Sequence, residues 1–127
     1  MNLIQAVRDL AERFPNSVYM SVDDVDYGDE CHYFEGEVTH CPETGCIIGQ
    51  AIRNLPESPV KEDLLYVIRS NPTRNVFFIM NELEALSGSC PFSHYQKKWL
   101  GCVQGQQDFG RPWATCVEMA DQRFGVR

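Results

Sequence analysis

Two short cysteine-containing patterns have the residue types and the spacing of metal ligands. Four residues separate Cys41 from Cys46, and three separate Cys90 from His94. Thiolate and imidazole are common ligands of tetrahedral zinc, so these side chains can form one zinc site. The spacings differ from the paired C-x2-C knuckles of zinc modules. Zinc is therefore the alternative, and no cofactor is the main prediction. The possible substitutes in this set are Cys31, His32 and His40.

Cys46 also lies where a thiol can be activated. It lies in the first turn of a predicted helix, whose dipole and free N–H groups would lower the pKa of the thiol and favour the thiolate. A nucleophile also needs a base and oxyanion donors, and the sequence supplies no motif for the donors. A small cysteine that packs a helix start into a core is the commoner arrangement. We therefore expect a structural role rather than catalysis. The histidines that can serve as a base are His32, His40 and His94.

Acidic residues are concentrated in the first half of the chain. Residues 1–64 carry 13 acidic and 4 basic side chains, whereas residues 65–127 carry 5 acidic and 7 basic ones. Eight carboxylates and no Lys or Arg lie between Asp23 and Glu43. Such a segment suits a protein partner with a basic surface, and a purely solvated face is the simpler alternative. The predicted partner-binding residues are Asp23, Asp24, Asp26, Asp29, Glu30, Glu35 and Glu37.

The same segment has a partial likeness to a calcium-binding loop. Asp24, Asp26 and Glu35 occupy positions 1, 3 and 12 of a loop of EF-hand length. Gly28 and Asp29 stand where the motif requires an oxygen ligand and then a glycine, and the flanking residues favour strands over helices. A solvated acidic loop explains the pattern better than calcium binding does.

Composition limits the class of protein. A chain of 127 residues with 43% hydrophobic and 23% charged residues suits one globular domain over residues 1–127. The net charge of −7 disfavours direct contact with nucleic-acid phosphates. No apolar run is long enough to span a membrane, and the N-terminal residues lack the features of a signal peptide. We expect a cytoplasmic protein with reduced cysteines.

Periodicity and capping residues predict mostly helical structure. Ser93 and Gln96 form a capping box, and Ser58-Pro59 and Asn71-Pro72 are typical of helix starts. Short alternating segments predict a small antiparallel sheet of two or three strands, packed against about five or six helices in an α+β fold. Helices are predicted over residues 2–14, 44–55, 60–69, 76–86, 94–107 and 112–124, and strands over 17–22, 31–34 and 38–40.

Two motifs give the chain a resemblance to a known group. The first is Cys46-Ile-Ile-Gly49 at a helix start, and the second is Gln107-Asp-x-Gly-x-x-Trp113 between the last two helices. Both are similar to those of small uncharacterised proteins common in actinobacteria and their phages. The resemblance covers roughly Cys31–Asp121 and implies a phage or actinobacterial context, without a mechanism. From the residues themselves, the turn at Gln107–Trp113 is interpreted as a structural closure, in which Asp108 caps the final helix or pairs with Arg111.

These observations favour a small, acidic, non-enzymatic protein-interaction module. Its acidic residues would bind a basic partner, which would be a host protein if the gene is phage-encoded. The alternative is a zinc-stabilised or thiol-active module centred on Cys41 and Cys46, with Cys90 and His94.

Overall fold

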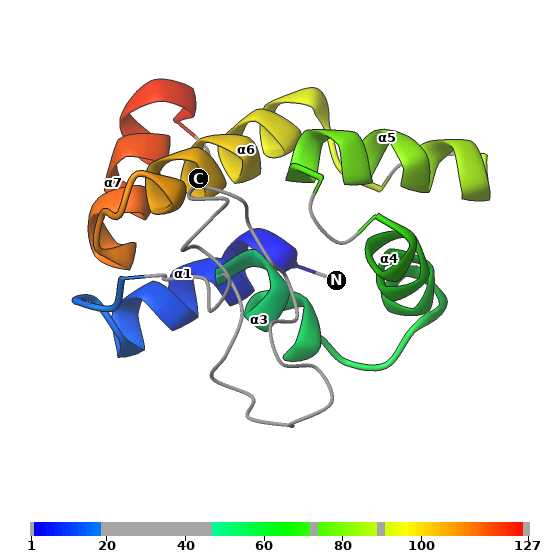
Figure 1. Cartoon of the computed structure of the whole chain (residues 1–127), viewed down its shortest axis with the longest axis horizontal. Helices are drawn as coiled ribbons and strands as arrows, with labels where there is room; N and C mark the ends of the chain where they lie inside the picture. Colours follow the sequence, from blue (N-terminus) through cyan, green and yellow to red (C-terminus); the bar gives the residue numbers. More distant parts are fainter. Residues whose placement is uncertain (1, 19–46, 72–73, 89–90, 126–127) are drawn as a thin grey trace, which may run out of the picture.

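The computed structural model describes residues 2–18, 47–71, 74–88 and 91–125, and these ranges contain six helices (Figure 1). The longest of them, α6, packs against three others, α3, α5 and α7. Helices α6 and α7 pack side by side as a hairpin. The helices are α1 (Leu3–Arg13), α3 (Ile47–Arg53), α4 (Pro59–Ser70), α5 (Val76–Ser87), α6 (His94–Asp108) and α7 (Trp113–Phe124).

Side-chain oxygens cap the first turns of α1, α4, α5 and α6. The predicted capping box is present, because Ser93 Oγ accepts from the Gln96 backbone N–H while the Ser93 N–H donates to Gln96 Oε1. The prediction of a helix start at Asn71-Pro72 is wrong. Asn71 ends α4, and Asn75 caps α5 by accepting from the Phe78 N–H at 2.9 Å. Each such cap is worth about 1 kcal/mol of helix stability.

One hydrophobic core receives side chains from all six helices. Trp99, Leu100 and Val103 of α6 have no exposed surface and form one buried face of the helix. Full burial of one such side chain stabilises the fold by about 1.5–3 kcal/mol, so these faces determine how the helices pack. None of the described helices is both long and apolar enough to cross a membrane.

Asp121 joins three helices. Its carboxylate accepts from both terminal nitrogens of Arg8 on α1, at 2.7 and 2.6 Å, and from Trp99 Nε1 on α6, at 2.9 Å. The Arg8 guanidinium also lies over the Trp99 ring, 5.1 Å from its centre. A bidentate pair of this kind fixes orientation as well as distance. Asp121 therefore sets the positions of α1, α6 and α7 relative to one another.

The segment after α1 caps the start of α7. The N–H groups of Trp113 and Ala114 donate to the carbonyl oxygens of Ser17 and Pro15, at 2.9 and 3.1 Å. Helix α7 has no side-chain cap, so the prediction that Asp108 caps it is wrong. Backbone carbonyls satisfy the N–H groups that a helix start leaves open.

Two glutamine side chains of α6 accept hydrogen bonds from the first N–H groups of two other helices. Gln107 Oε1 accepts from the Ile47 N–H of α3 at 2.7 Å, and Gln104 Oε1 accepts from the Val76 N–H of α5 at 2.6 Å. Both glutamine side chains are buried. A buried N–H group without a partner destabilises a fold by about 1–3 kcal/mol, so these contacts attach α3 and α5 to α6.

Lys61 closes the connection between α3 and α4. It is only 6% exposed, and its ammonium donates to the carbonyl oxygens of Arg53 and Leu55 and to Glu57 Oε1, at 3.0, 2.8 and 2.9 Å. An ammonium group has three N–H donors, and all three have an acceptor here. This arrangement explains how a lysine can be buried at the end of α3.

The α+β prediction is wrong for the part of the chain that the structure describes. Residues 2–18, 47–71, 74–88 and 91–125 contain helices and no strand. The alternating pattern that suggested a strand over residues 17–22 begins at Ser17 and Val18. The Ser17 carbonyl accepts from the first N–H group of α7 rather than from a neighbouring strand, and Val18 is 44% exposed. Residues 19–22 and the strands predicted over 31–34 and 38–40 lie outside the described residues.

Candidate functional site

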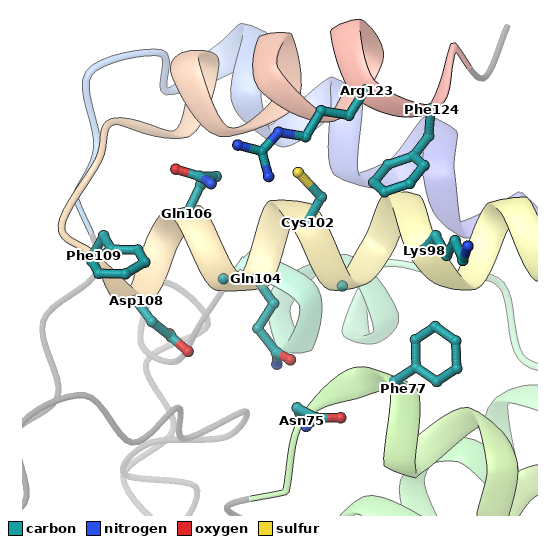
Figure 2. A pocket seen from close by; sticks show the side chains of 12 residues that line it. Asn75, Phe77, Lys98, Cys102, Gln104, Gln106, Asp108, Phe109, Arg123 and Phe124 are labelled. Atoms are coloured by element: carbon teal, nitrogen blue, oxygen red, sulfur yellow. The ribbon is translucent and has the colours of Figure 1, made fainter.

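A groove of about 560 Å³ runs along an exposed face of α6, between the start of α5 and the end of α7 (Figure 2). We call it the α6 groove. Its main components are two glycines, three phenylalanines and two basic side chains, and Cys102, Gln106 and Asp108 also line it. In Figure 2, Cys102 points towards α7 and Gln104 points towards Asn75 at the start of α5. The groove therefore lies where three helices meet.

Gly101 and Gly105 lie one helical turn apart on the α6 side of the groove. Among the described residues, a Cβ atom added at Gly105 would meet nothing within 4 Å, and one at Gly101 would reach only ordinary contact with Phe77 at 3.8 Å and Val76 at 3.9 Å. Neither glycine has a positive φ angle. A glycine inside a helix is about 1 kcal/mol less favourable than alanine. Neither the backbone conformation nor the packing of the described residues requires glycine here.

Three phenylalanines place apolar surface along the groove. Phe109 follows the last residue of α6 and is 79% exposed, which is unusual for so large an apolar side chain. Phe77 lies on the first turn of α5 and is half-buried, and Phe124 is the last residue of α7. Exposed ring surface of this kind is typical of a site that another molecule covers.

Two basic side chains, Lys98 and Arg123, also line the groove. Neither forms an ion pair with an acidic residue in the described ranges. Asp108 is the acidic side chain of the lining, and it accepts from Gln107 Nε2 at 3.2 Å. Burial raises the pKa of the Cys102 thiol, and the Arg123 charge partly opposes this effect. The thiol is therefore protonated at neutral pH, which is unfavourable for a nucleophile.

Gln106 differs from its neighbours on α6. Its side chain lines the groove and is 9% exposed, yet its buried Oε1 has no hydrogen-bond partner among the described residues. Most buried side-chain oxygens in proteins accept at least one hydrogen bond. This oxygen is buried beneath the surface of the groove rather than exposed in it.

Most of the residues that the sequence analysis selected lie outside the described ranges. Of the zinc alternative, the structure describes only His94, the first residue of α6. His94 is exposed, and its ring meets Phe77 edge-on at 6.1 Å. Within the described ranges no three His, Cys, Asp or Glu side chains are grouped as metal ligands. The acidic residues Asp23–Glu37 and the cysteines 31, 41, 46 and 90 are not described, and their predicted roles stay predictions.

The α6 groove was not found from the sequence. Its signal was the pair of helical glycines at positions 101 and 105, followed by the phenylalanine at position 109. The turn Gln107–Trp113, which contains Phe109, was interpreted as a structural closure. The hydrogen bond between Gln107 and Ile47 gives this turn a structural role. Comparisons with models of protein families, with curated proteins and with solved structures gave no match to this chain.

Proposed function

We propose that this protein is a small, non-enzymatic protein-interaction module whose α6 groove binds a segment of a partner protein. The observation that carries this proposal is the exposed phenylalanine surface beside glycines that the described fold does not require. Phe109 is 79% exposed at one end of the groove, and no described residue lies within 4 Å of a Cβ atom added at Gly105. Protein interfaces are enriched in aromatic anchors, which fill shallow hollows of this kind.

We propose the acidic residues Asp23–Glu37 as a second contact surface, for a basic region of the partner. This part of the proposal rests on the sequence, in which the first 64 residues carry far more acidic than basic side chains. Contacts of this type accelerate association and weaken with added salt. The resemblance to proteins of actinobacteria and their phages supports a cytoplasmic location and a host protein as partner.

Selection from a displayed library of random peptides tests the groove. The folded protein serves as bait, and Gly105→Leu is the counter-bait because its side chain would occupy the groove. We expect this variant to fold, since leucine is a good helix former and no described residue lies within 4 Å of a Cβ atom at position 105. Tyr66→Ala is the matched control, because Tyr66 is 63% exposed on α4 and does not line the groove.

Peptides that bind the natural chain and Tyr66→Ala but not Gly105→Leu would support the proposal. Peptides that bind all three proteins equally would overturn it, because they would bind elsewhere. A selection that enriches no peptide would overturn it as well. Thermal melting of the three proteins shows whether each bait is folded.

A further inference from the structure

We infer that the α6 groove binds an acidic amphipathic helix of a partner protein. The inference rests on the proposed function and specifies the shape and charge of the partner segment. The helix would lie over Gly101 and Gly105, with its apolar face towards Phe77, Phe109 and Phe124. Its carboxylates would lie near Lys98 and Arg123, the two basic side chains of the groove.

The helical walls of the groove favour a helix over a β-strand as the bound segment. A peptide strand binds by adding to the edge of a sheet, and the described residues contain no strand. A helix satisfies its own backbone groups and needs only apolar and polar side-chain contacts. Glycines one turn apart allow a second backbone to approach α6 closely. From Lys98 to Phe109 the groove extends along about 16 Å of helix, which is about three turns.

The charges favour acidic residues in that helix. Lys98 and Arg123 form no ion pair with described residues, and one acidic side chain, Asp108, lines the same groove. The whole chain carries a net charge of −7, so long-range attraction would not bring an acidic helix to it. The preference must therefore come from short-range contact, since charges beyond about 10 Å are largely screened at ordinary ionic strength.

Three designed peptides of about 18 residues test the inference. The first is an amphipathic helix of Leu, Phe, Ala, Ser and Glu. The second has Lys in place of every Glu, and the third has two central prolines that break the helix. Binding is followed by fluorescence polarisation and by the NMR shifts of the Gly101 and Gly105 amides. We expect the first peptide to bind at least tenfold more tightly than either of the others, and to move both glycine signals.

Variants of the protein separate binding from folding. Gly105→Ala should melt at a higher temperature and still bind the first peptide several-fold more weakly, because its methyl group enters the groove. Lys98→Gln and Arg123→Gln should each lower the affinity for the first peptide by about threefold, and neither should lower the affinity for the Lys peptide. Tyr66→Ala should change neither affinity nor melting temperature.

Each alternative outcome has a clear meaning. Equal or tighter binding of the Lys peptide would overturn the acidic specificity. Equal binding of the proline peptide would overturn the helical shape. If none of the designed peptides bound, the inference would fail, while groove-dependent peptides from the display selection would keep the proposed function. If neither the display selection nor the designed peptides showed binding at the groove, both the proposed function and the inference would be overturned.

Discussion

The side-chain oxygen of Gln107 lies 2.7 Å from the backbone nitrogen of Ile47, 60 positions earlier in the chain. Helix α3 has only seven residues as described, and a helix that short is unstable alone in water. It depends on its buried apolar face and on this contact from α6. Gln104 makes the equivalent contact with Val76 of α5, one turn earlier on α6.

Replacing Gln107 by alanine should destabilise the protein by about 1–3 kcal/mol, because the Ile47 N–H would remain buried without an acceptor. Urea denaturation followed by circular dichroism measures this difference. Gln122→Ala is the control, since Gln122 is exposed on α7, and we expect it to change stability by less than about 0.5 kcal/mol. Equal effects of the two substitutions would show that the Gln107 contact does not stabilise α3.

Asp121→Ala should be more destabilising than Arg8→Ala. Loss of Asp121 leaves Trp99 Nε1 buried without its acceptor, which should reduce stability by about 1–3 kcal/mol. The Arg8 and Asp121 side chains are 27% and 36% exposed, so loss of the ion pair alone should have an effect of about 1 kcal/mol or less. Urea denaturation at low and high salt measures both variants, and the effect of Arg8→Ala should shrink with salt. Glu118→Ala, on the exposed side of α7, is the control. The reverse order of effects would contradict the role given to Trp99.

Lys61→Met should destabilise the protein by about 1–3 kcal/mol, because two carbonyl oxygens at the end of α3 lose their donor. The matched control is Lys98→Met, in which the replaced lysine is exposed in the α6 groove. Thermal and urea denaturation compare the two. An unchanged Lys61→Met variant would show that the ammonium group does not hold the connection between α3 and α4.

Cys116 makes stability depend on pH in the alkaline range. Burial raises the pKa of its thiol from an ordinary value of 9.0 to about 12. Between these values the folded chain keeps a proton that the unfolded chain releases, so stability must fall as the pH rises from about 9 towards 12. Below pH 9 the thiol is protonated in both states, and the stabilising effect is fully present.

The variant Cys116→Ala isolates this effect from other groups that titrate at high pH. It should be less stable than the natural chain at pH 8, because it leaves a small cavity, and its stability should decline less between about pH 9 and pH 11. The urea concentration at the midpoint of unfolding, measured across this pH range for both proteins, provides the comparison. Parallel declines in the two proteins would show that this thiol is not protected by folding.

Local signals in the sequence predicted most of the described helices, although the start of α5 and the cap of α7 were wrong. The capping residues Ser58 and Ser93 act as expected, and the apolar segment over 76–80 is a helix because its stripe continues to Leu83. Each of these signals depends on neighbours within a few residues. The prediction of a strand at Ser17 was wrong because alternation over a few residues does not reveal the distant hydrogen-bond partner of the Ser17 carbonyl, which is Trp113.

The site depends on relationships that local patterns do not contain. Gln104 was not identified as a cap, because its partner Val76 is 28 positions away. The α6 groove exists because α5 and α7 approach α6 on either side of Gly101 and Gly105. The predicted acidic and cysteine sites at residues 23–46 and 90 were chosen for residue type and for spacing along the chain. They lie outside the described residues and stay predictions.

The pairing of Arg8 with Asp121 has a consequence for how the chain folds during synthesis. The two residues are 113 positions apart, so α1 leaves the ribosome long before its partner on α7 has been made. The carbonyl groups of Ser17 and Pro15 are likewise synthesised long before the N–H groups of Trp113 and Ala114, which donate to them in the folded chain. The apolar face of α1 must therefore stay partly uncovered until α7 arrives. Domains generally fold as units, so the described helices would pack together only after α7 has left the ribosome.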